Sequence, residues 1–119
     1  MNDDVAAKLS MLEIKRDRTM AELDAVQAAG KSVQKSMEGF REKQSALNEH
    51  FLALLDADGT PEDQRLALYR DWNSAFSSGV AEYNELAIER ERLHMQEIIL
   101  VRMLTELDFQ IKALKSSFE

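Results

Sequence analysis

The sequence contains no cysteine, and its 119 residues include only one proline and four glycines. Without cysteine the chain has neither a disulfide framework nor a thiolate for catalysis, which fits a reducing compartment. So little proline and glycine leaves few signals for turns and loops. Aromatic residues make up 7% of the chain, too few for the core of a conventional β-sandwich. These absences together favour an all-α fold.

A long hydrophobic run is also missing. The longest strongly apolar stretch, Ile98–Val101, is far shorter than the roughly 20 residues that a membrane-spanning helix needs. The acidic start of the chain, Met1–Asp4, lacks the apolar segment of a secretory signal peptide. We therefore expect a cytoplasmic protein with no membrane span.

Positive charge is scarce, because 15 lysines and arginines stand against 22 acidic residues and leave a net charge of −7. Such a surface repels phosphate backbones, so we expect no nucleic-acid partner. The chain is instead 45% hydrophobic and 31% charged, a mixture dominated by helix-forming residues. Its length predicts a single structural unit over residues 1–119.

Residues that interrupt a helix are concentrated between Asp56 and Asp63. Gly59 suits the left-handed conformation that often ends a helix. Thr60 is a good N-cap, and Pro61 suits the first position of a helix. We therefore predict two helices, over about residues 4–56 and 61–117, joined by a turn at 57–60.

Apolar residues recur in both segments at alternating steps of four and three residues. In the first segment, eleven of fifteen such positions are apolar: Val5, Leu9, Leu12, Arg16, Thr19, Leu23, Val26, Gly30, Val33, Met37, Phe40, Gln44, Leu47, Phe51 and Leu54. In the second, twelve of fifteen are apolar: Tyr69, Trp72, Phe76, Gly79, Tyr83, Leu86, Arg90, Leu93, Glu97, Leu100, Leu104, Leu107, Ile111, Leu114 and Phe118. A sustained repeat of 3.5 residues predicts two coiled-coil seams. We call these two sets the seams, and they predict a long antiparallel two-helix coiled-coil hairpin.

The position of the turn predicts which seam residues face each other. A turn centred near residue 58 brings Phe40 close to Phe76. It also places Thr19 opposite Glu97, with Arg16 near enough to pair with that glutamate. A shift of one heptad keeps both seams intact and remains an alternative.

A second alternative is a compact bundle in which a helix breaks. Gly30 weakens its helix by about 1 kcal/mol relative to alanine. Residues 73–79 also have poor helix propensity and end in Gly79. A break at either glycine would replace the hairpin.

A further set of apolar residues lies outside the seams, mostly on the faces turned away from them: Met11, Ile14, Ile88, Met95, Ile98, Ile99 and Phe109. A two-helix hairpin needs only one apolar stripe on each helix. A second stripe predicts burial against a protein partner, or against a second copy in a homodimeric four-helix bundle. In the predicted register Leu114 and Phe118 overhang the first helix and form a docking element.

Two short patterns in the sequence have the spacing of chemical sites. Residues 25–32 are similar to the end of a phosphate-binding loop, but Ala25 occupies a position that needs glycine. Glu91 and His94 have the spacing of metal ligands on one helical turn, but no second copy of the motif accompanies them. We therefore expect no enzyme, no cofactor and no metal site. An enzyme or metal protein that uses Glu91 and His94 is the alternative.

The predicted architecture resembles the small coiled-coil stalk proteins of bacterial type III secretion and flagellar export. The resemblance rests on the polar turn, the two heptad segments and the length of the chain. It implies a role in coupling an export ATPase ring to the export gate, or in escorting export chaperones. The chain is also similar in outline to small helical secretion chaperones, which hide an amphipathic stretch of a client. The net charge of −7 is more acidic than that of the stalk proteins, and an ATPase ring is therefore not the partner that the charge favours.

Overall fold

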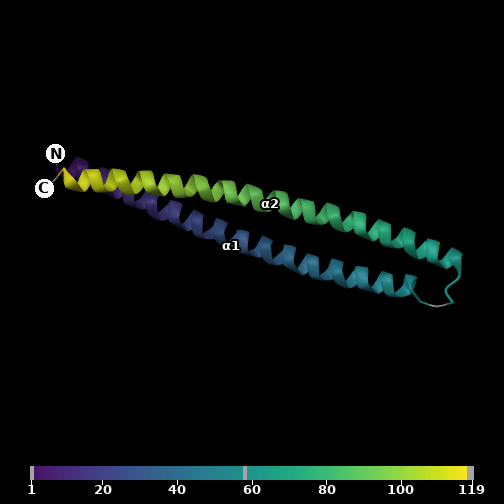
Figure 1. Ribbon diagram of the computed structural model, residues 1–119. Coiled ribbons are helices and arrows are strands. Elements are labelled where there is room, and N and C mark those ends of the chain that lie inside the picture. Colours follow the sequence, from purple (N-terminus) through teal and green to yellow (C-terminus); the bar gives the residue numbers. More distant parts are fainter. Residues whose placement is uncertain (1, 58, 118–119) are drawn as a thin grey trace. The chain divides into compact units, whose positions relative to one another are not determined.

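The computed structural model describes residues 2–57 and 59–117, and these form two helices without any strand (Figure 1). Helix α1 covers Asn2–Leu55 and helix α2 covers Glu62–Ser116. The all-α helical hairpin predicted from the sequence is confirmed, and the helix ends lie within two residues of their predicted positions.

The connection between the helices explains the small differences at their ends. The Asp56 amide donates to Leu52 O at 3.0 Å, and Gly59 adopts the left-handed conformation with φ of 81°. Pro61 O accepts the first hydrogen bond of α2 from the Arg65 amide, at 3.0 Å. Thr60 therefore lies outside the helix, and its predicted N-cap role is wrong: its hydroxyl donates to Ala57 O at 3.1 Å.

Both helices continue through the glycines at which a break was considered. The alternative of a compact bundle with a broken helix is therefore wrong. Apolar residues that flank the glycines in each seam explain the continuity, because their packing offsets the poor helix propensity of glycine. Gly30 lies in α1 and Gly79 lies in α2.

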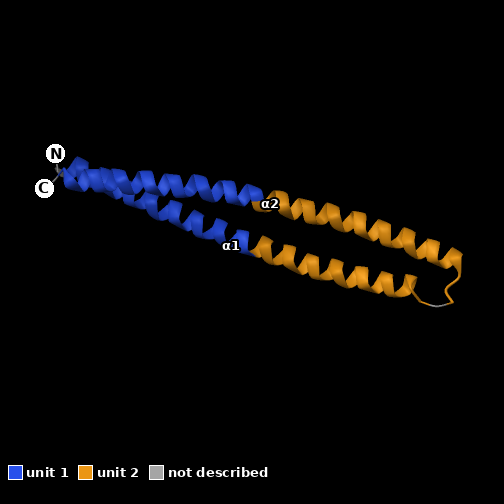
Figure 2. Cartoon of the chain, viewed as in Figure 1, with its two compact units in different colours: residues 1–31, 91–119 blue, residues 32–90 orange. Residues whose placement is uncertain are grey.

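The hairpin divides into two compact units, each built from part of α1 and part of α2 (Figure 2). The first unit comprises residues 1–31 and 91–119, and the second comprises residues 32–90. In both units the two helical segments are antiparallel. Among the described residues, the buried hydrophobic side chains all belong to the predicted seams: Leu23, Leu93, Leu100, Leu107 and Ile111 in the first unit and Met37 in the second.

The register of the second unit differs from the predicted one by a heptad. The ring centroids of Phe40 and Tyr83 are 6.2 Å apart, so Phe40 faces Tyr83 and the predicted proximity to Phe76 is wrong. Gln34 Oε1 likewise accepts from the Arg90 guanidinium at 3.4 Å. A shift of one heptad leaves every seam residue in its seam, so the pattern alone does not distinguish the two registers.

The first unit has the same shifted register. Gln27 Nε2 donates to Glu97 Oε1 at 3.4 Å. The Arg16 guanidinium lies 3.7 Å from Asp108 Oδ1. The predicted pairing of Arg16 with Glu97 is therefore wrong, because each of these side chains has a different neighbour in the shifted register.

Candidate protein-binding surface

The apolar residues outside the seams are exposed in the structure. In the first unit these are Met11, Ile14, Met95, Ile98, Ile99 and Phe109, whose exposed fractions range from 39% to 70%. Ile88 is 70% exposed and belongs to the second unit. Hydrophobic side chains this exposed are costly when they gather on one face, and such faces mark sites of association.

Helix geometry divides the first-unit residues between two faces. Met11 and Ile14 lie on the side of α1 that points away from α2. Met95 and Phe109 lie on the side of α2 that points away from α1. The two helices face each other at the seam, so their outer sides point in opposite directions. The apolar residues outside the seams therefore form two separate surfaces, one on each helix.

The α2 surface is the more continuous of the two, and we call it the outer face of α2. Met95, Ile98, Ile99 and Arg102 follow the spacing of residues on one side of a helix. Phe109 extends this face two turns beyond Arg102. The face is therefore an apolar strip that one arginine interrupts.

Ile99 also borders a shallow hollow between the helices of the first unit. The hollow has a volume of about 350 Å³ and is lined by Glu22, Ala25, Val26, Gln96, Ile99 and Leu100. The seam residues Val26 and Leu100 form its base, and Ala25 leaves space on the α1 side. Ala25 was not identified from the sequence as part of a binding surface. The signal available in the sequence is a small residue next to the seam residue Val26.

A second hollow lies further along the same side of the first unit. Its volume is about 390 Å³, and it is lined by Lys15, Arg102, Met103, Glu106, Leu107 and Gln110. Leu107 follows Leu100 by two helical turns, so the two hollows share one side of the seam. We call the residues that line both hollows the lateral flank.

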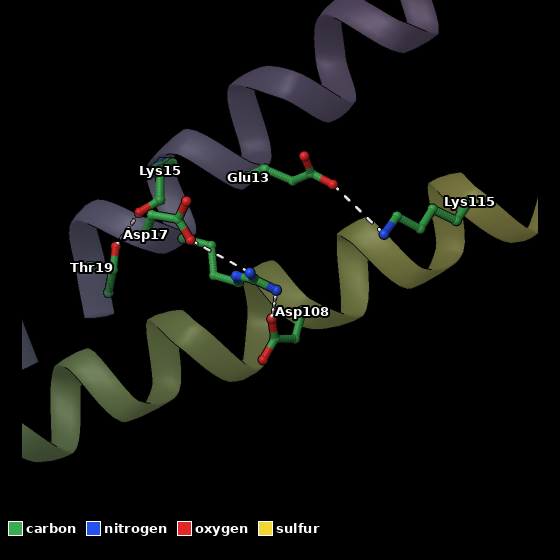
Figure 3. A network of polar contacts seen from close by, with 7 residues as sticks. Glu13, Lys15, Asp17, Thr19, Asp108 and Lys115 are labelled. Carbon is green, nitrogen blue, oxygen red and sulfur yellow. Dashed lines mark hydrogen bonds and ion pairs between the residues drawn. The ribbon is translucent and has the colours of Figure 1, made fainter. Parts of the chain in front are cut away.

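The opposite side of this seam carries charge. Asp108 follows Leu107 and Glu106 precedes it, so at about 100° per residue they lie on different sides of the seam. Arg16 pairs there with Asp17 at 3.5 Å and with Asp108 at 3.7 Å. Figure 3 shows this network, in which Lys115 Nζ also lies 3.7 Å from Glu13 Oε1. These ion pairs make that side a solvated surface.

The overhang predicted for the docking element at the end of α2 is wrong for Leu114, whose role in binding a partner stays a prediction. Leu114 is half-buried, and its neighbour Lys115 lies beside Glu13 of α1. The shifted register keeps Leu114 alongside α1 instead of beyond it. Phe118, the other predicted residue, lies outside the described residues.

The second unit has its own aromatic surface. Tyr69 and Trp72 have ring centroids 5.8 Å apart, and Trp72 and Phe76 have centroids 5.9 Å apart. Tyr69 is 48% exposed and Phe76 is 42% exposed, while Leu68 is half-buried. At Tyr69 the predicted seam position is therefore displaced by one residue, because an α-helix drifts relative to a strict heptad. Trp72 remains in the seam, and its Nε1 donates to Asn48 Oδ1 at 2.9 Å.

Another hollow of the second unit has a volume of about 330 Å³ and is lined by Phe40, Arg41, Gln44, Gly79, Val80 and Tyr83. The Arg41 guanidinium lies 5.3 Å from the centroid of the Tyr83 ring and donates a hydrogen bond to the Tyr83 hydroxyl. This contact closes one side of the hollow by a cation–π interaction.

The two residues weighed as metal ligands, Glu91 and His94, are both exposed. Across residues 2–57 and 59–117, no group of three or more histidine or acidic side chains is placed to hold a metal ion. In the same part of the chain, neither helix has an apolar stretch sufficient to cross a bilayer.

The comparisons with known proteins identify no relative of this chain: no family model matches it, no curated protein matches it, and no solved structure matches it.

Proposed function

We propose that this protein is a non-enzymatic protein-interaction module, acting as an adaptor, stalk or chaperone. It binds another protein through the outer face of α2, where Met95, Ile98, Ile99 and Phe109 are exposed. Met11 and Ile14 provide a second contact on the opposite side of the first unit. The exposed apolar strip on a helix that already buries its seam is the observation that supports this proposal.

The energetics favour contacts that cover several of these side chains together. Covering one large aliphatic or aromatic side chain fully contributes about 1.5–3 kcal/mol. Association itself costs translational freedom and side-chain ordering, which one side chain does not offset. Ile98, Ile99 and Met95 lie within one turn of each other, so a single partner helix can cover all three.

Within this class we propose a cytoplasmic role in bacterial secretion or flagellar export. The hairpin of two long helices supports it, and so does the lack of cysteine. The net charge of −7 favours a basic partner surface over an acidic one.

Substitution on the outer face tests the proposed function. We expect the double variant Ile98→Asp/Ile99→Asp to stay helical and to lose proteins that the native chain retains in a pull-down. Ala28→Asp is the control, because Ala28 is exposed on α1 and lies outside the outer face of α2. If the double variant retains the same proteins as the native chain, the outer face of α2 is not the binding surface.

A further inference from the structure

The lateral flank of the first unit has more exposed apolar surface than a two-helix unit needs. Ile99 is 54% exposed and Met103 is 39% exposed, although both lie beside buried seam leucines.

The two helices contribute complementary strips to this flank. In the first hollow, the small side chain of Ala25 on α1 lies across from Ile99 on α2. In the second hollow, Lys15 of α1 and Glu106 of α2 line the same space. Within the described part of the chain, the Lys15 ammonium makes no ion pair. The first hollow therefore combines a small residue with a large one, and the second combines a base of α1 with an acid of α2.

Residues that lie side by side on the two helices of one chain face each other between two chains when a two-fold axis relates the copies. A two-fold axis parallel to the helices places α1 of one copy over α2 of the other at the same height. Ile99 of each copy then fills the space beside Ala25 of the other copy. The long side chain of Lys15 of each copy likewise reaches Glu106 of the other copy, which lies within one helical turn of the same height, and each contact occurs twice.

The alternative two-fold arrangement fits poorly. An axis across the helices places α2 on α2 and α1 on α1. With the axis at the level of Ile99, the two Ile99 side chains meet each other, while Ala25 faces Ala25 of the other copy across a gap. Overpacking on one side and a void on the other are both destabilising.

We propose that two copies of this chain associate through the lateral flank, with both hairpins pointing the same way, and form a four-helix bundle. The occupant of the two hollows is thus a second copy of the chain. This assignment goes beyond the proposed function, because Met95 and Phe109 face away from the flank and stay available for a different protein.

Two matched arginine substitutions test the position of this interface. Ala25 and Ala28 are both exposed on α1, so a single chain accommodates arginine at either position. Ala25 lines the flank, whereas Ala28 does not. By light scattering we expect twice the 13.6 kDa of one chain for the native protein and for Ala28→Arg, and one chain for Ala25→Arg. A single-chain mass for the native protein, or equal masses for the two variants, overturns the proposal.

Charge reversal tests the arrangement and does not depend on the folding of Ala25→Arg. Lys15→Glu places two acids against each other twice in the dimer, and Glu106→Lys places two bases against each other. We expect each variant alone to dissociate roughly tenfold more readily than the native chain. An equimolar mixture should regain the native affinity, because every contact in the mixed dimer is between opposite charges. A mixture that associates no better than either variant alone overturns the proposed pairing.

Discussion

Gln44 and Gly79 meet across the second unit so closely that a Cβ atom at position 79 would lie 2.5 Å from Gln44 Oε1. The same Cβ would lie 3.1 Å from Cζ of Phe40. Gln44 Nε2 is buried there without a hydrogen-bond partner among the described residues. The absence of a side chain at Gly79 therefore provides the space that a polar seam residue occupies.

This contact predicts different effects of alanine at the two seam glycines. A Cβ at Gly30 meets nothing within 4 Å, so Gly30→Ala should raise the free energy of unfolding by about 0.5–1 kcal/mol through helix propensity. Gly79→Ala gains the same propensity but displaces Gln44 and crowds Phe40, so its effect should be about 1 kcal/mol less favourable. Urea denaturation followed by circular dichroism measures both. Equal stabilisation by the two variants would contradict the close contact.

The buried amide of Gln44 predicts a stabilising substitution. Gln44→Leu removes a buried donor without a partner and adds an apolar side chain to the seam, so the free energy of unfolding should rise by about 1–2 kcal/mol. Gln27→Leu is the control, since Gln27 is exposed and should change the stability by less than about 0.5 kcal/mol. Destabilisation by Gln44→Leu would mean that the amide has a partner, such as bound water.

Adjacent residues on α2 should differ sharply in their contribution to stability. Leu100 is 8% exposed, whereas Val101 is 44% exposed. Leu100→Ala leaves a cavity in the seam and should lower the free energy of unfolding by about 2–4 kcal/mol. Val101→Ala should cost less than about 0.5 kcal/mol. Both values are measured by chemical denaturation at one protein concentration, and similar losses would mean that the seam is misplaced.

The proposed functions use different sides of the first unit. The lateral flank, with Ala25 and Met103, is assigned to a second copy of the chain. The outer face of α2, with Met95 and Phe109, is assigned to another protein. Ile99 borders both, so Ile98→Asp/Ile99→Asp probes the two surfaces together, whereas Ala25→Arg probes the flank alone.

The two helices, their ends and most of the seam residues could be predicted from the sequence. Heptad spacing depends only on the order of residues, and the residues around Gly59 mark the turn locally. Leu23, Leu93 and Leu107 are buried where the repeat predicts. The same pattern identified Ile99 and Phe109 as surplus apolar residues, and both are exposed.

Only the tertiary structure decided the register and the division of the surface. A coiled-coil repeat is unchanged by a shift of one heptad, so the sequence does not distinguish Tyr83 from Phe76 as the neighbour of Phe40. The contact of Gln44 with Gly79 and the pairing of Arg16 with Asp108 belong to the shifted register alone. Whether two exposed residues share a face likewise depends on how the second helix lies against the first, which packing across the seam determines.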